Sequence, residues 1–406
     1  MWSPDSQLLG YVRIHQSTDK FEFAIETRDA KDGAPVPVLA NTGPWPSLCW
    51  LRNGRMIYSM AEPEPNSHDS NLWEIGIEAR TGAPLGRPTR ITNWSGSSLG
   101  ALSNTADGKR LAFSKSSSHS DVYVGELEAN GTRLKSPRRL TFSESDNRPS
   151  GWTADSKSVL FSSDRDGRFA VFKQGLDQDS PERLTSGPDN YIYPHLSSDG
   201  SWVLCVAVPT MQGSLWTPAD VMRVPLSGGT PEFVARTTFD LRCASSPANL
   251  CLFDQPSLDH KRLAFIASDP VRGGQREVMT IDIDPAGIYN WDLSPDGSRV
   301  AIENVEDHEG HVRILPIGGG AAQEIKVKGW GPLRSLDWAA DGKSFFTSIY
   351  SGQRATLLHS DLQGRAQAVW WTQGADNTWG VPSPDGKKLA FLGATTQSNV
   401  WMIENF

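Results

Sequence analysis

Leu293-Ser-Pro-Asp296-Gly-Ser-Arg-Val-Ala301 is repeated twice further on, as Trp338-Ala-Ala-Asp341-Gly-Lys-Ser-Phe-Phe346 and Pro382-Ser-Pro-Asp385-Gly-Lys-Lys-Leu-Ala390. Each copy holds a tetrad of the form Ser/Ala-Pro/Ala-Asp-Gly, followed by a segment of alternating character. The Asp side chain can accept hydrogen bonds from backbone amides in a turn, and Gly adopts positive φ without strain. The tetrad therefore predicts a tight turn between two β-strands.

The tetrad recurs along the whole chain. The aspartates of the three copies above are 45 and 44 residues apart. Earlier copies, at steps of 48, 54, 48 and 44, are centred on Asp5, Asn53, Asp107, Asp155 and Asp199. The 97 residues from Asp199 to Asp296 leave room for two units, one of them a divergent copy around Cys243 to Phe265. A period of about 40–50 residues in a β-rich chain is typical of a propeller.

We therefore expect an all-β fold: a single β-propeller of four-stranded antiparallel blades, with nine repeats and about eight to nine blades. Segments such as Asp121–Leu127 and Asn399–Met402 fit a third strand. The fourth strand ends in Arg-x-Thr, as in Arg90–Thr92, Arg139–Thr141 and Arg183–Thr185. A ring could close, or the chain could be the last part of a longer array. Because no linker-like segment divides it, we expect residues 1–406 to form one domain.

The composition excludes some functions. Acidic residues outnumber basic ones 47 to 39, which gives a net charge of −8 and argues against nucleic acid as a partner. Gly and Pro together make 64 residues, and there are 15 Trp, which favours short strands and many turns over a helix bundle. No run of 18 apolar residues occurs, so we expect no membrane insertion by this chain.

The N-terminus and the cysteines bear on the compartment. Met1–Asp5 has no basic or apolar region of a signal peptide and lies inside a repeat, so we expect Met1 to be an internal cut. Cys243 and Cys251 flank a Ser-Pro-Ala-Asn turn that could bring their sulfurs together in a disulfide. The alternative is a pair of buried thiols. A disulfide would indicate an oxidising compartment.

The repeats resemble the TolB-type, WD-like propeller repeats of bacterial envelope proteins. A more specific resemblance covers essentially the whole chain, and rests on Asn71–Glu74, Thr105–Phe113, Val122–Leu127, Met222–Gly229, Arg242–Cys251 and Asn399–Phe406. These segments are similar to the C-terminal propeller of acidobacterial membrane receptors. In that group a Ser/Thr kinase or a winged-helix DNA-binding domain precedes the propeller, generally with a transmembrane helix between them.

The resemblance implies an extracytoplasmic (periplasmic) sensing or interaction domain, whose full-length protein would be anchored in a membrane. It also implies that Phe406 is a natural terminus. It supplies no catalytic or ligand residues for this chain.

Two motifs raise the question of catalysis or metal binding. Gly96–Gly100 fits Gly-x-Ser-x-Gly, but a nucleophile elbow needs a strand before it and a helix after it, and these flanks indicate a loop entering a strand. Glu306, His308 and His311 could hold a divalent metal near a hairpin tip, although a solvated charged turn is the commoner explanation. We expect no catalytic residues, no metal and no cofactor.

Ligand binding is the more plausible activity, because the loops around a propeller channel commonly carry ligands. The candidates on or before inner strands are Trp50, Trp152, Tyr193, His195, Trp291, Trp338 and Trp379. Tryptophans at these positions can also pack between blades. We select Tyr193, His195, Trp291 and Trp379 as the predicted contacts for a protein, peptide or small-molecule ligand in the channel.

The sequence thus favours a non-catalytic sensor or interaction domain of a bacterial signalling receptor. One alternative is a free-standing periplasmic scaffold similar to TolB. Another is the propeller of a prolyl-oligopeptidase-type peptidase, whose hydrolase domain would have to precede Met1.

Overall fold

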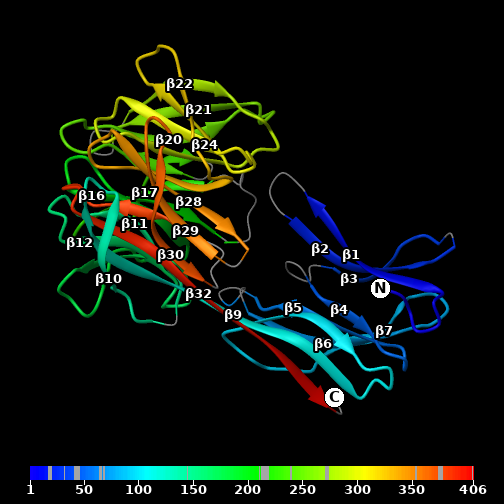
Figure 1. Cartoon of the computed structure of the whole chain (residues 1–406). Coiled ribbons are helices and arrows are strands. Elements are labelled where there is room, and N and C mark those ends of the chain that lie inside the picture. The colour runs from blue at the N-terminus through cyan, green and yellow to red at the C-terminus, as the bar shows by residue number, and fades with distance from the viewer. Residues whose placement is uncertain are drawn as a thin grey trace. The chain divides into compact units, whose positions relative to one another are not determined.

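The computed structural model describes the chain except for residues 17–20, 32, 41–45, 64–65, 67–68, 144, 210, 212–218, 238–239, 270–273, 353, 374–377 and 405. The described residues form 32 strands and no helix (Figure 1). Within this part of the chain there is consequently no helix of the length and apolarity that a membrane span requires. The prediction of an all-β fold is confirmed.

The chain divides into two compact units. The first unit contains residues 1–118 and 396–406, and the second contains most of residues 119–395. Two long strands, β9 (Arg110–Glu128) and β32 (Lys388–Glu404), pair with each other and contribute residues to both units (Figure 1). The described strands build eight antiparallel sheets, in agreement with the expected count of about eight to nine.

The first unit contains two complete sheets and part of a third. The three-stranded sheet consists of β1 (Leu8–Gln16), β2 (Phe21–Asp29) and β3 (Val36–Ala40). The four-stranded sheet consists of β4 (Leu48–Trp50), β5 (Arg55–Ala61), β6 (Ser70–Ile77) and β7 (Pro84–Arg90). The strand β8 (Ser98–Asn104) pairs with the first half of β9.

The second unit contains five sheets of four consecutive strands each. The first sheet consists of β11 (Asn147–Trp152), β12 (Ser158–Ser163), β13 (Ala170–Gly175) and β14 (Glu182–Arg183). The second sheet consists of β15 (Asn190–Leu196), β16 (Trp202–Val208), β17 (Ala219–Pro225) and β18 (Glu232–Thr237). The third is β19 (Leu241–Cys243), β20 (Cys251–Pro256), β21 (Arg262–Ser268), β22 (Gln275–Asp282). The fourth sheet consists of β23 (Tyr289–Leu293), β24 (Arg299–Asn304), β25 (His311–Pro316) and β26 (Gln323–Lys326). The fifth sheet consists of β27 (Leu333–Trp338), β28 (Ser344–Ser351), β29 (Arg354–Asp361) and β30 (Ala366–Gln373).

A sixth sheet of this unit combines the two ends of its chain. Its strand order is β31 (Gly380–Pro382), β32, β9 and β10 (Arg133–Arg139), so C-terminal and N-terminal segments lie side by side. We call it the closing sheet. One of its faces packs Val122 against Phe161 of β12, and the other packs Phe391 against Phe346 of β28. Burying large apolar side chains such as these stabilises the fold by about 1.5–3 kcal/mol each.

The six sheets of the second unit close into a ring. Each first strand (β11, β15, β19, β23, β27 and β31) contacts the first strand of the next sheet, and β31 contacts β11. The ring is smaller than the eight or nine blades expected in a single ring. The reason is that the repeats around Asp107 and Asp385 contribute to one common sheet, through β8–β9 and β31–β32, while two further sheets belong to the first unit.

The disulfide position follows from the strand register. Cys243 on β19 lies opposite Cys251 on β20, and their sulfurs are bonded. The other two cysteines, Cys49 and Cys205, are buried thiols. Burial raises the pKa of each of these thiols to about 12, so neither is reactive near neutral pH.

Candidate ligand site at the channel mouth

A cavity of about 330 Å³ lies where the six inner strands of the ring end. The last residue of every inner strand lines it: Trp152, Leu196, Cys243, Leu293, Trp338 and Pro382. All six sheets therefore contribute to one site, which we call the channel mouth. A cavity of this volume is within the range of small-ligand pockets.

The repeated turn explains why these loops are held in place. In the copy at Ser294, the hydroxyl donates to Asp296 Oδ1 at 2.6 Å and accepts from the Arg299 amide at 2.9 Å. The Asp296 carboxylate also accepts from the Ser298 amide at 3.0 Å, and Gly297 has φ of +70°. The first and third tetrad residues are thus used by the turn. The second is free to line the cavity, as Ala154, Ser198, Pro295, Ala340 and Pro384 do.

The residue before the last one on each inner strand also lines the cavity. These residues are Gly151, His195, Arg242, Asp292, Asp337 and Val381. Side chains alternate along a strand, so this position points away from the neighbouring sheets and into the channel. Four of the six are ionisable, and they determine the electrostatics of the site.

Arg242 is the cation at the centre of this cluster. It forms an ion pair with Asp240, and its Nε lies 3.3 Å from Asp292 Oδ1. Burial disfavours its charge, but the carboxylates of Asp240, Asp292 and Asp337 outweigh burial and raise its pKa. The guanidinium therefore stays positive, with its side chain about 16% exposed and held by the acids around it.

The acids outnumber this cation. Burial raises the pKa of Asp240 to about 7 and that of Asp292 to about 6, in both cases against the attraction of Arg242. Burial and the neighbouring Asp292 hold the pKa of Asp337 well above its ordinary value. Three carboxyl groups thus face one guanidinium, and the channel mouth gains negative charge as the pH rises through neutrality.

His195 contributes a neutral ring. Burial, and then the positive charge of Arg242, hold its pKa well below the ordinary value. Its Nε2 lies 3.2 Å from Nη1 of Arg242. Since Arg can only donate, Nε2 accepts and the ring proton resides on Nδ1.

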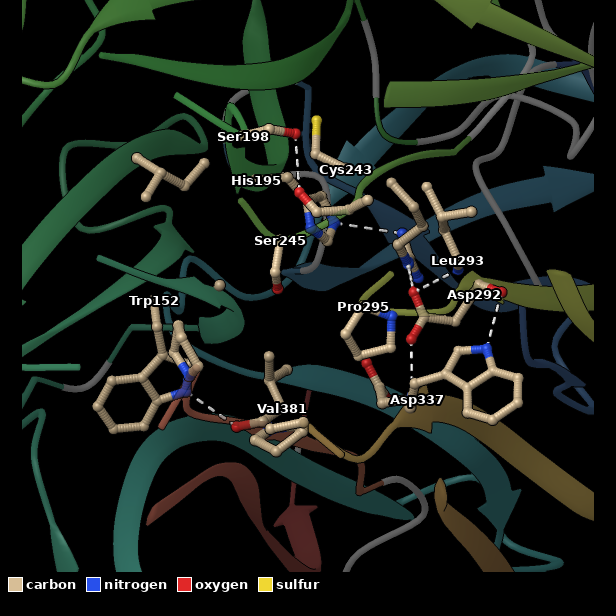
Figure 2. Close-up of a pocket in the computed structure, with 18 of the residues that line it drawn as sticks. Trp152, His195, Ser198, Cys243, Ser245, Asp292, Leu293, Pro295, Asp337 and Val381 are labelled. Carbon is tan, nitrogen blue, oxygen red and sulfur yellow. Dashed lines mark hydrogen bonds and ion pairs between the residues drawn. The ribbon is translucent and has the colours of Figure 1, made fainter. Parts of the chain in front are cut away.

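The opposite side of the cavity is apolar. Figure 2 shows Trp152 and Val381 together, away from His195 and Asp292. The indole Nε1 of Trp152 donates to the carbonyl of Val381 at 2.9 Å, which ties β11 to β31 across the ring closure. The channel mouth therefore has one charged side and one apolar side.

Of the four predicted ligand contacts, His195 alone lines the cavity. Trp291 is 1% exposed and packs edge-on against Phe265, because it alternates with the channel-facing Asp292. Tyr193 lies at a β-bulge and packs against the core between two sheets. Trp379 donates from Nε1 to the carbonyl of Pro149 at 2.7 Å, next to β31.

Two of the other three aromatic candidates also line the cavity. Trp152 and Trp338 line its rim, whereas Trp50 is buried in the first unit. No group of three His, Cys, Asp or Glu side chains within the described ranges is placed to hold a metal ion. Glu306 and His308 are exposed, and His311 Nδ1 lies 2.8 Å from Asp307 Oδ2 instead.

The hydrolase-like motif has the geometry of a strand. Ser98 begins β8, and no helix follows it in the described chain. Its hydroxyl donates to the carbonyl of Ser116 on β9 at 3.5 Å. The serine therefore begins a strand and does not lie on the strand-to-helix turn that a nucleophile elbow requires.

Sequence reasoning did not select Asp240, Arg242, Asp292 or Asp337. A usable signal was present, because His195, Asp292 and Asp337 each stand four residues before the aspartate of a tetrad. The residue at this position varies from repeat to repeat, while the turn stays the same. Aligning the repeats with one another would have identified the channel-facing position.

The ring of six sheets defines the fold, a β-propeller, and this fold is similar to that of the TolB propellers. Residues 83–284 match the family model described as the TolB β-propeller domain. A solved structure from Agrobacterium tumefaciens that is assigned to TolB is similar with a TM-score of 0.53 and 16% identity. The match covers 68% of this chain and 99% of that one, and it supports the fold.

Two relatives are similar in sequence over shorter ranges. An uncharacterized protein of Agrobacterium fabrum is 22% identical over 197 residues, which are 48% of this chain and 52% of the relative. Tricorn protease homolog 1 of Streptomyces coelicolor is 30% identical over 105 residues, or 24% of this chain and 9% of the relative. This chain thus matches about half of the first relative and about a tenth of the second.

Proposed function

We propose that the second unit binds a polypeptide segment at the channel mouth and carries out no chemistry on it. The observation that carries the proposal is the cavity of about 330 Å³ to which all six inner strands contribute. A segment with a basic side chain fits best, because carboxyl groups exceed guanidinium groups on the charged side. Apolar parts of the same segment would pack against Trp152 and Val381.

The arrangement around His195 supports binding over catalysis. A nucleophilic mechanism needs a hydroxyl or thiol within hydrogen-bond reach of a base. Nε2 of His195 contacts Arg242, the hydroxyl of Ser198 donates to the carbonyl of Ala244, and the sulfur of Cys243 is in a disulfide. These three groups of the channel mouth are therefore engaged with neighbouring residues and are not paired as nucleophile and base.

We infer that the propeller works outside the cytoplasm, as a sensing or interaction domain of a signalling receptor. The Cys243–Cys251 disulfide supports an oxidising compartment. The resemblance of the repeats to the propellers of acidobacterial receptors supports the signalling role. A polypeptide ligand at the channel mouth would then be the signal or the partner that the receptor detects.

The test uses linear peptides displayed on phage and selected against the chain of residues 1–406. Ser245 is exposed and lines the cavity, so Ser245→Trp fills the channel mouth. Ser180 is exposed on the loop between β13 and β14, away from the cavity, and Ser180→Trp is the matched control. We expect the selected peptides to contain basic residues and to bind Ser245→Trp at least about tenfold more weakly, with Ser180→Trp unchanged.

Replacing His195 with Ala should weaken the binding of the same peptides by about three- to tenfold, because one polar contact and the support for the Arg242 side chain are lost. Peptides that bind the parent chain and Ser245→Trp equally well would overturn the proposal. So would a library that yields no binder at all.

A further inference from the structure

A short sequence occurs three times on third strands: a residue with a side-chain carbonyl or carboxylate, then an aliphatic residue, then an aromatic one. The copies are Asn71-Leu72-Trp73 on β6, Asp121-Val122-Tyr123 on β9 and Asn399-Val400-Trp401 on β32. In the first two copies the strand is paired on both sides. In the third it is paired on one side within the described chain.

On β6 the motif holds the Arg-x-Thr segment that ends the fourth strand. The Thr92 hydroxyl donates to Asn71 Oδ1 at 2.8 Å and accepts from the Leu72 amide at 2.9 Å. The Arg90 guanidinium lies 5.6 Å from the centre of the Trp73 ring. Each residue of the motif thus has a defined partner on the neighbouring segment.

On β9 the threonine of Arg139-Leu140-Thr141 makes the same two hydrogen bonds, while the arginine contacts the first residue of the motif and not its aromatic ring. The Thr141 hydroxyl donates to Asp121 Oδ1 at 3.0 Å and accepts from the Val122 amide at 3.0 Å. Arg139 forms an ion pair with Asp121 at 2.8 Å. In both examples the motif on a third strand binds the threonine of an Arg-apolar-Thr segment that ends the neighbouring fourth strand.

On β32 the motif is present and that segment is not. Val400 is 82% exposed, whereas Leu72 and Val122 at the equivalent position are 0% exposed. Asn399 is exposed, and its side chain has no hydrogen-bond partner among the described residues. Trp401 is 47% exposed and has Lys115 at 4.9 Å from its ring centre on one face.

We propose that the edge of β32 at Asn399–Trp401 binds an extended strand of the form Arg-apolar-Thr, supplied by polypeptide outside residues 1–406. The threonine hydroxyl of that strand donates to Asn399 Oδ1 and accepts from the Val400 amide. The arginine lies against the ring of Trp401. Adding a strand to an unpaired sheet edge is an established mode of recognition, in which backbone hydrogen bonds give affinity and side-chain pockets give specificity.

The probe is a synthetic peptide with the sequence of residues 84–94, Pro-Leu-Gly-Arg-Pro-Thr-Arg-Ile-Thr-Asn-Trp, titrated calorimetrically into the chain of residues 1–406. We expect one peptide to bind per chain. Asn399→Ala in the protein and Thr→Val at the ninth peptide position should each weaken binding by about tenfold. Gln397→Ala, at an exposed neighbour on the same strand, should leave it unchanged.

Because the Asn399 side chain has no hydrogen-bond partner among the described residues, Asn399→Ala should keep the parent Tm, and this separates loss of binding from loss of folding. Equal affinity of the parent and Asn399→Ala for the peptide would overturn the proposal, as would absence of binding. A dimer of the chain, detected by sedimentation and lost on Val400→Glu, would also overturn it, since a second copy would then cover this edge.

Discussion

Glu303 on β24 is a buried acid with only half of its carboxyl group satisfied. It is 2% exposed, Oε1 accepts from Asn290 Nδ2 at 3.0 Å, and Oε2 has no hydrogen-bond partner in the part of the chain that the structure describes. Burial raises the pKa of this carboxyl group to about 8. The hydrogen bond from Asn290 opposes this rise, and repulsion from the Asp337 carboxylate adds to it. At pH 7 the group is therefore largely protonated in the folded protein.

The substitution Glu303→Gln tests this assignment through the pH dependence of stability. An unfolded chain ionises Glu near pH 4.3, roughly, so between that pH and about 8 the folded state holds a proton that the unfolded state has lost. The parent should lose stability as the pH rises through this window. Glu303→Gln should be close to the parent at pH 4.5 and more stable by roughly 2–4 kcal/mol at pH 9.

Urea unfolding at a series of pH values measures this difference. Asp282→Asn, at an exposed acid, is the control and should show no such trend. A Glu303→Gln variant that is less stable than the parent at pH 9 would mean that the buried carboxylate is paired, contrary to the structure.

At the scale of single elements, the repeated turn stabilises the strands on both sides of it. The Ser294 hydroxyl is fully buried and both donates and accepts, whereas the Ser298 hydroxyl of the same turn is exposed and donates to the same carboxylate at 2.7 Å. A buried hydrogen bond that loses one partner leaves the other unsatisfied, while water can replace an exposed one.

We therefore expect Ser294→Ala to lower the free energy of unfolding by about 1–2 kcal/mol and Ser298→Ala by less than about 0.5 kcal/mol. Denaturant titration of the two variants measures both values. Equal losses would show that the turn is held by its backbone alone. The copy at Ala339, which forms the same turn without the hydroxyl, shows that the backbone contributes part of it.

Local structure could be predicted from the sequence because each tetrad carries its own turn chemistry. Asp296, Asp341 and Asp385 each lie between two paired strands as expected, and β7, β10 and β14 end at the arginine of an Arg-x-Thr segment. The channel-facing charges were missed because a varying position gives no pattern in a single repeat. Trp291 was selected as an aromatic on an inner strand, yet alternation places it in the core.

At the scale of the whole molecule, closure depends on pairing between segments that are far apart in the sequence. The strands β9 and β32 are neighbours in the closing sheet, and nothing local to either segment indicates the other. Repeat counting gives nine units, one more than the eight sheets, because the repeats around Asp107 and Asp385 contribute to one common sheet. It does not say which sheets share a ring. The prediction that residues 1–406 act as one domain stays a prediction.

The most direct test of the six-sheet ring compares two fragments by calorimetry. Residues 119–395 contain every strand of the ring, with β9 from His119 onward and β32 up to Thr395, and residues 147–395 lack β9 and β10 of the closing sheet. The ring predicts one cooperative unfolding transition for the first fragment and none for the second, since removing β9 takes away Val122, which covers Phe161, and leaves β32 with Phe391 unpaired on that side. Cooperative unfolding of both fragments, or of neither, would contradict it.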